Sequence, residues 1–234
     1  MGKIRRVDFR IEAGGHPNLP IVTVLIDGED VIGRSTGYQG FDPDDLLGPD
    51  SPLLPTDPPR RIAVYRCSCG EAGCGCAACF ISERDGVVRW YDFRDFVGVY
   101  SAPTVGEDPA GGEEHALPNF AFDASQYRAA VESASADRGW ETRQRRVARL
   151  LHDRLVANAQ VFTERGYGIG WVWPESDRDA GFRVELRRPN GQVIVRTNAE
   201  PGLADEQAAA RMAADLADHP EGWDVVDRNE WHAE

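Results

Sequence analysis

The sequence predicts an α+β fold, in which a β-rich N-terminal part precedes a part that mixes helices and strands. In the first part, alternating apolar residues are separated by hairpin turn signals. Apolar residues then recur at helical spacing, and three strand-like runs and an alanine-rich helix follow. We therefore predict a β-rich part at residues 1–100, a linker at 101–119 and an α+β part at 120–234.

Strands and turns are expected over residues 3–33, where apolar residues alternate and Asp27-Gly28 supplies a turn. Asp42 and Pro43 predict the start of a short helix, because aspartate caps helix N-termini and proline fits the first turn. Gly48 ends that helix. Residues 49–59 contain five prolines and predict an extended linker.

All five cysteines lie between Cys67 and Cys79, with the spacing C-x-C-x4-C-x-C-x2-C. The stretch connects a predicted strand at residues 61–66 with another at 78–84, and Asp85-Gly86 then turns the chain into a third strand. Gly70, Gly73 and Gly75 separate the thiols and permit tight backbone turns. This pattern is typical of a metal knuckle on a strand-to-strand connection.

Zinc is the ion expected there, because structural zinc sites take four thiolate or imidazole ligands. The expected ligands are Cys67, Cys69, Cys74 and Cys76, whereas Cys79 lies in an apolar run and is expected to be a buried residue. Such a closed four-thiolate site leaves no position for catalysis.

Four alternatives to zinc are open for this stretch. An iron–sulfur cluster can use the same four thiolates. Disulfides need an oxidising compartment, and five cysteines leave one over. A redox switch could pair Cys67 and Cys69 with Cys76 and Cys79, and the simplest alternative is a set of free buried thiols.

The segment Cys67–Gly75, with the later Val88-Arg89-Trp90-Tyr91-Asp92-Phe93 and the upstream Leu46-Leu47-Gly48-Pro49, resembles a group of uncharacterised bacterial proteins. Those proteins carry a similar CxCGxxGCG segment before a V-x-W strand. The resemblance covers roughly residues 40–95 and implies a common fold, without any activity. Cys76 and Cys79 fall outside the shared pattern, which leaves the fourth ligand open.

The net charge of −13 makes nucleic acid an improbable main partner, because phosphates repel an acidic surface. The acidic surface serves solubility, or it binds or blocks a basic protein. Residues 200–234 are the most negative segment, with ten acidic and two basic residues. No apolar run is long enough for a membrane span and no secretory signal is recognisable, so a cytoplasmic protein is expected.

In the second half, Asp123 is expected to cap a helix that ends near Ser135, with Gln126 at the capping-box offset. Asp137 is expected to cap a longer helix that Gly166 ends. The polar face of the longer helix carries five arginines. We interpret them as a solvated face neutralised by i,i+4 acidic partners such as Glu141–Arg145 and Arg149–Asp153, in preference to a nucleic-acid site.

Strands are expected around Trp171-Val172-Trp173 and on both sides of Asn190-Gly191, a strong hairpin signal. A helix is expected from Leu203 to about Asp218, with a short strand after it. Trp90, Trp171, Trp173 and Phe182 are expected to fill the core. His115 lies in the predicted linker and is expected to be a solvated loop histidine.

No nucleotide-binding loop, nucleophile elbow or HExxH motif is present in the sequence. His152-Asp153 is an isolated pair of the kind that is usually structural. The sequence therefore favours a non-enzymatic binding or inhibitor protein, of an immunity-like type, acting on a basic partner. The alternatives are an enzyme of unrecognised class and a thiol-based redox switch at the cysteines.

Overall fold

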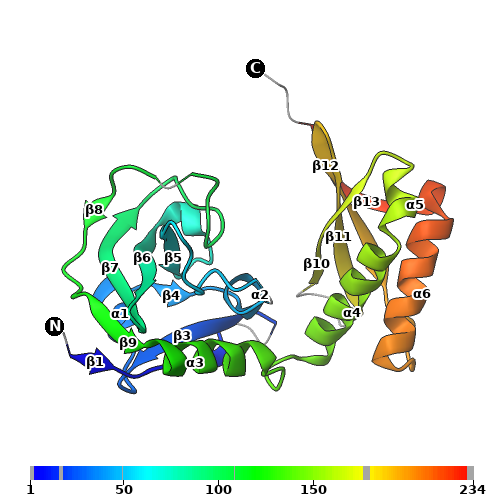
Figure 1. Ribbon diagram of the computed structural model, residues 1–234. Helices are drawn as coiled ribbons and strands as arrows, with labels where there is room; N and C mark the ends of the chain where they lie inside the picture. Colours follow the sequence, from blue (N-terminus) through cyan, green and yellow to red (C-terminus); the bar gives the residue numbers. More distant parts are fainter. Residues whose placement is uncertain (1–2, 16–17, 49, 108, 176–179, 231–234) are drawn as a thin grey trace. The chain divides into compact units, whose positions relative to one another are not determined.

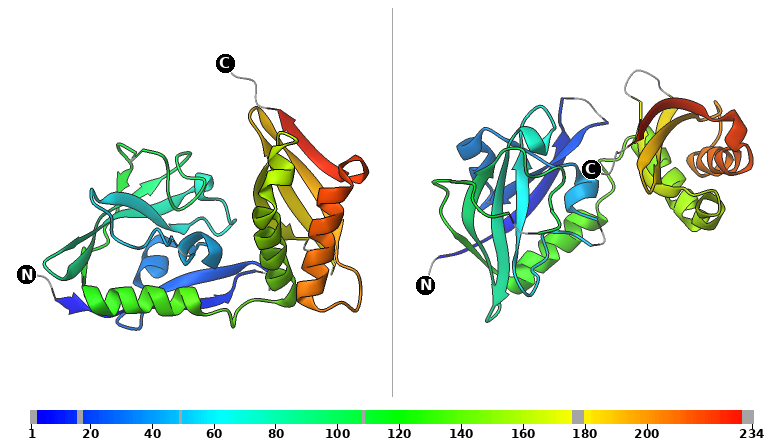
Figure 2. Two further views of the ribbon diagram at one scale, coloured as in Figure 1. Left: turned by 45° about the vertical axis from the view of Figure 1, so that its right-hand side comes forward. Right: turned by 90° about the horizontal axis from the view of Figure 1, so that it is seen from above.

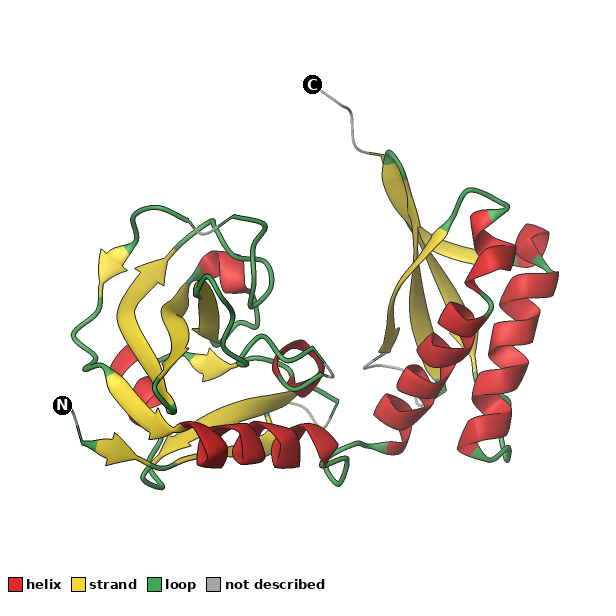
Figure 3. Ribbon diagram, viewed as in Figure 1, coloured by secondary structure: helices red, strands yellow, loops and turns green. Residues whose placement is uncertain are grey.

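The protein has an α+β fold, described here by a computed structural model that covers residues 3–15, 18–48, 50–107, 109–175 and 180–230 (Figure 1). The chain forms two compact units, Met1–Trp140 and Glu141–Glu234. Each unit has its own hydrophobic core. Strands dominate the first unit, whereas the second combines two long helices with strands (Figure 3).

The first unit is built on a seven-stranded sheet with the strand order β1-β9-β7-β6-β5-β4, to which β8 adds by pairing with β7. A separate two-stranded sheet pairs β2 with β3. The strands are β1 (Ile4–Arg5), β2 (Val7–Ala13), β3 (Pro20–Ile26), β4 (Gln39–Gly40), β5 (Arg60–Arg66), β6 (Cys76–Arg84), β7 (Val87–Phe96), β8 (Glu113–Glu114) and β9 (Phe120–Asp123).

The helices of the first unit are α1 (Val31–Thr36), α2 (Pro43–Leu46), the 3-10 turn η1 (Ala72–Cys74) and α3 (Ala124–Ala136). The expected caps of α2 and α3 are confirmed: the Asp42 side chain accepts a hydrogen bond from the Asp44 N–H, and Asp123 accepts one from the Gln126 N–H. The expectation of strands and turns over residues 3–33 is wrong at its end, because the Asp30 side chain caps helix α1 there by accepting from the Gly33 N–H.

The hairpin between β6 and β7 turns at Asp85-Gly86 as predicted, and both residues have positive φ. The segment predicted as an extended linker at 49–59 instead carries Ser51 and Leu53, which are both buried. Its residues contribute to the core because the Ser51 hydroxyl donates to the Leu46 carbonyl and turns the chain inward.

The boundary between the two units lies between Trp140 and Glu141 and so differs from the predicted linker at 101–119. Residues 101–119 are instead bonded to the strands of the first unit. The Pro103 carbonyl accepts a hydrogen bond from the Ala63 N–H, and the His115 N–H donates to the Phe93 carbonyl. Beyond this segment, β9 pairs with β7, and α3 packs on β2.

The second unit is an antiparallel four-stranded sheet in the order β10-β11-β12-β13, with α4 and α6 over one face (Figure 2). The predicted meander and the hairpin at Asn190-Gly191 are confirmed. The elements are α4 (Arg143–Ala157), α5 (Ala159–Thr163), β10 (Gly168–Pro174), β11 (Gly181–Arg188), β12 (Gly191–Asn198), α6 (Asp205–Asp218), the 3-10 turn η2 (Pro220–Gly222) and β13 (Asp224–Glu230).

The predicted long helix from Asp137 begins later and is divided in two. The Thr142 side chain caps α4 by accepting from the Arg145 N–H, and Asn158 separates α4 from α5. Trp90 and Phe182 are buried as predicted. The prediction for Trp171 is wrong: its side chain is 37% exposed at a register shift of β10. Trp173 is half-buried, with the Arg145 guanidinium 4.5 Å from its ring centroid.

Candidate metal centre

Three of the five cysteines form a cluster on the connection between β5 and β6, two neighbouring strands of the first unit. Two turn hydrogen bonds fold this connection: the Gly70 N–H donates to the Cys67 carbonyl at 2.9 Å, and the Gly75 N–H to that of Ala72 at 3.1 Å. Gly70 adopts φ = +93°, which suits glycine. The tight path brings the cysteine side chains toward one point.

The sulfur atoms of Cys67, Cys69 and Cys74 all lie within 4.8 Å of one another. Zinc–sulfur bonds of about 2.3 Å in a tetrahedron place ligand sulfurs about 3.8 Å apart, so small side-chain adjustments bring the three around one ion. Cys67 is half-buried, whereas Cys69 and Cys74 are exposed. The cluster can therefore hold a metal ion at the protein surface.

Cys76 was predicted as the fourth ligand, but its sulfur is not in this group of three within the described chain. Cys76 is the first residue of β6 and pairs with Arg66, the last residue of β5. Cys67 follows Arg66 in the chain, and its N–H donates to the carbonyl of Gly75. Because successive strand residues point to opposite faces of a sheet, this register directs Cys67 and Cys76 to opposite sides. Cys79 is fully buried, as the sequence indicates.

The three clustered thiols share hydrogen bonds that favour one thiolate. The backbone N–H of Cys69 and the thiols of Cys69 and Cys74 lower the pKa of Cys67. Hydrogen bonds to Cys67 and then to Cys69 raise the pKa of Cys74 to about 11, because the Cys74 thiol keeps its proton to donate to these sulfurs. By contrast, burial, and then the charge of Asp95, raise the pKa of Cys76 to about 12. A first anionic ligand thus forms most readily at Cys67.

Two polar residues near the cluster were not identified from the sequence. Tyr38 has a raised pKa because of burial, with the charges of Asp95 and then of Cys76, Cys67 and Cys74 as further causes. Asp95 has a raised pKa through burial, and its Oδ1 atom has no hydrogen-bond partner in the described chain. No local motif marks either residue, because β4 and β7 bring them to the site only through sheet pairing.

His115 differs from the solvated loop histidine expected from the sequence. Its side chain is only 13% exposed, and its Nε2 atom lies 4.0 Å from Asp95 Oδ2. Its Nδ1 atom accepts a hydrogen bond from the Leu117 N–H at 3.3 Å. It lies outside the metal-binding group of the described residues.

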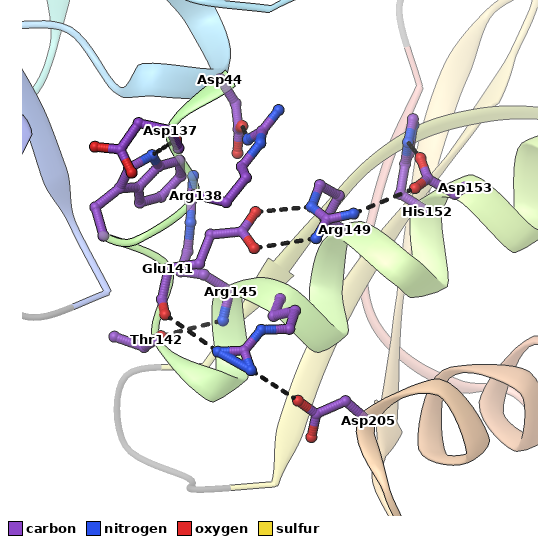
Figure 4. Close-up of polar contacts among 12 residues, drawn as sticks. Asp44, Asp137, Arg138, Glu141, Thr142, Arg145, Arg149, His152, Asp153 and Asp205 are labelled. Atoms are coloured by element: carbon purple, nitrogen blue, oxygen red, sulfur yellow. Dashed lines mark hydrogen bonds and ion pairs between the residues drawn. The ribbon is translucent and has the colours of Figure 1, made fainter. Parts of the chain in front are cut away.

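The arginine-rich face of α4 is largely paired with carboxylates of its own unit (Figure 4). Glu141 accepts two hydrogen bonds from Arg149, at 2.7 and 3.0 Å, and Arg149 lies 3.8 Å from Asp153 as predicted. Asp205 on α6 binds Arg143 and Arg146. This neutralisation agrees with a solvated structural face, as the sequence analysis preferred.

A pocket of about 440 Å³ lies in the first unit between α3 and the segment before β5. Leu54, Val131 and Arg128 are among its lining residues. None of the described residues that line it is a cysteine or histidine, so the pocket is separate from the thiol cluster.

Fold and site together define an α+β protein with a surface cluster of three thiols that can hold a metal ion. Comparisons of the chain with protein-family models, with curated proteins and with solved structures found no match. Across the described residues, every helix falls short of the length or the apolar character that a membrane span requires.

Proposed function

We propose that this protein binds zinc through Cys67, Cys69 and Cys74 and uses the ion to fix the connection between β5 and β6. The observation that carries the proposal is the mutual approach of the three sulfurs within 4.8 Å. Thiolates are soft ligands that select zinc, copper(I) or iron–sulfur clusters over magnesium or calcium. Zinc is the ion of choice because it favours tetrahedral thiolate sites without redox chemistry.

In this proposal the fourth zinc position is open to solvent. The register of β5 and β6 directs Cys76 away from the cluster, and two of the three ligand residues are exposed. The role of the ion in this proposal is structural: the Cys67 N–H already joins the ends of the connection by donating to the Gly75 carbonyl at 2.7 Å, and a bound ion adds links among the side chains of Cys67, Cys69 and Cys74.

Native mass spectrometry of the reduced, purified protein tests this proposal directly. We expect about one zinc per chain in the wild type and in Cys76→Ala, and none in Cys74→Ala. Loss of zinc from Cys76→Ala would show that Cys76 is a ligand after all. A visible absorption spectrum typical of an iron–sulfur cluster would show that such a cluster, and not zinc, occupies the site. A reduced wild-type protein without metal would sink the proposal.

A thiol redox switch is the second candidate, favoured by the exposure and closeness of Cys69 and Cys74. In that role two thiols lose two electrons and two protons to an external disulfide and form an intramolecular disulfide. Metal-free reduced protein that gains a disulfide within residues 67–74 in a glutathione redox buffer would favour the switch over zinc.

A basic protein partner is a further proposal that rests on the net charge alone. Several of the acidic side chains of residues 200–234 already pair within the second unit: Asp205 with Arg143, Glu206 with Arg154, and Asp224 with Arg196. A complex recovered from lysate whose affinity falls steeply between low and moderate salt would support this role, and one insensitive to salt would count against it.

A further inference from the structure

Tyr38 is fixed beside the thiol cluster by its backbone position. It lies between the glycine that ends α1, Gly37, and the two-residue strand β4. Gln39 pairs with Arg66 of β5, so Tyr38 lies one residue beyond this pair, alongside Cys67. The alternation of the paired strands therefore directs Tyr38 and Cys67 to the same side.

The hydroxyl group of Tyr38 occupies the space over Gly75, the residue that follows the third cluster cysteine. A Cβ atom added to Gly75 would lie 2.8 Å from the Tyr38 hydroxyl oxygen and 3.3 Å from Cζ. The φ angle of Gly75 is 167°, an extended conformation that any residue adopts. A side chain at position 75 would therefore meet the Tyr38 phenol, and either that ring or the new side chain would have to shift.

The hydroxyl proton of Tyr38 is available to the cluster. Within the described chain, no hydrogen bond involves this hydroxyl, although the backbone N–H of Tyr38 donates to Thr36. Metal-bound thiolates keep lone pairs that accept hydrogen bonds, and such outer contacts orient the ligands and tune metal affinity. A phenol held over Gly75, next to Cys74, is suited to this task.

We propose that Tyr38 is a positioning residue of the metal centre, whose hydroxyl donates a hydrogen bond to a metal-bound thiolate of the cluster. This inference rests on the proposed zinc site. It explains why a glycine separates Cys74 from Cys76, and it adds a residue that neither touches the ion nor belongs to the cysteine stretch. Loss of an outer-shell contact typically weakens metal affinity by about 10- to 100-fold.

The test compares full-length wild type, Tyr38→Phe and Tyr91→Phe. Tyr91 is a matched control, because it is a tyrosine of β7 in the same unit and stacks on Phe80. Zinc affinity is measured by competition with a chromophoric chelator, and the cobalt(II) form is measured by its thiolate charge-transfer absorption. We expect Tyr38→Phe to bind zinc about 10-fold or more weakly with a shifted cobalt band, and Tyr91→Phe to match the wild type.

Gly75→Ala provides a second, independent variant. Its methyl group displaces the phenol, so it is expected to weaken zinc binding in the wild type but to add little in the Tyr38→Phe background. Thermal unfolding of the metal-free proteins separates folding defects from ligand effects. Equal zinc affinity and cobalt spectra for Tyr38→Phe and wild type would overturn the inference, whereas a wild type without zinc would instead overturn the proposed function.

Discussion

The side-chain amide of Gln126 forms two hydrogen bonds with the backbone of Val7: its Oε1 atom accepts from the N–H at 3.2 Å, and its Nε2 atom donates to the carbonyl at 2.6 Å. The amide thereby imitates a paired strand residue at the start of β2. It joins α3 to a segment that lies 119 positions away in the sequence. A capping-box glutamine would face its own helix, whereas this one ties two distant segments together.

Gln126→Glu keeps the size of this side chain but removes the N–H donor and places a carboxylate beside a carbonyl oxygen. We expect the free energy of unfolding of the first unit to fall by about 1–3 kcal/mol. Urea unfolding followed by circular dichroism measures this loss. Gln160→Glu, at an exposed residue of α5 whose side-chain amide donates to Glu164, is the control. Equal effects of the two substitutions would show that the Val7 contact contributes little.

Tyr127→Phe is expected to destabilise the first unit through two buried partners. The Tyr127 hydroxyl donates to the Leu53 carbonyl at 2.7 Å and accepts from Trp90 Nε1 at 3.1 Å. Removing the hydroxyl leaves both groups unsatisfied in the core, which costs about 1–3 kcal/mol. Tryptophan fluorescence during urea unfolding reports the change. Tyr91→Phe serves as control, and equal midpoints for the two variants would contradict the expectation.

Cys74→Ser is expected to loosen the first unit locally. Without the third thiolate the metal is lost, and amide hydrogen exchange should rise across residues 61–93, around the cluster. Protection of α4 should stay unchanged, because its core belongs to the second unit. Hydrogen exchange with mass readout distinguishes the outcomes. Unchanged protection at 61–93 would rule out a structural role for the metal, and loss of protection in α4 would mean that the two units unfold together.

Glu175 is expected to make the stability of the second unit depend on pH. Its buried carboxylate accepts hydrogen bonds from Arg183 at 2.9 Å and Arg196 at 3.0 Å. Burial alone would raise its pKa, but the two arginines bring the pKa of Glu175 below its ordinary value of 4.5. The resulting stabilisation is complete above that ordinary pKa, which holds in the unfolded chain, and is lost as the pH falls through the lower folded-state pKa.

Glu175→Gln is therefore expected to be less stable than the wild type near neutral pH, and the difference should narrow as the pH falls below about 4. Urea unfolding from about pH 7 to about pH 3 measures the free energy of unfolding of the wild type and of Glu175→Gln at each pH. Glu164→Gln is the control, since Glu164 is exposed on the same unit. A wild-type advantage that persists unchanged at the acidic end would show that the Glu175 carboxylate is not the responsible group.

Local signals made much of this fold predictable. Asp85-Gly86 and Asn190-Gly191 mark their hairpins because these dipeptides suit the tight two-residue turns that join antiparallel strands. Asp42 and Asp123 mark helix starts because their side chains accept from N–H groups two or three residues on. In the same way, dense cysteines with intervening glycines indicated the thiol cluster.

What the sequence did not predict depends on pairing between distant segments. The separation of Cys76 from the cluster follows from its register opposite Arg66, and spacing along the chain carries no such information. Tyr38 reaches the cluster through β4, a strand of only two residues. The two units divide at Trp140, beyond the linker expected at 101–119, because β9 pairs with β1 and α3 packs on β2, both near the start of the chain.

The parallel pairing of β1 with β9, which matches Ile4 with Ala121, has a consequence for synthesis on the ribosome. The first strand leaves the exit tunnel long before its partner is translated. At about 5–20 residues per second, β1 waits roughly 6 to 24 s for β9. During that interval the backbone groups of β1 that later pair with β9 have no partner, so the nascent chain offers a period in which chaperones can bind it.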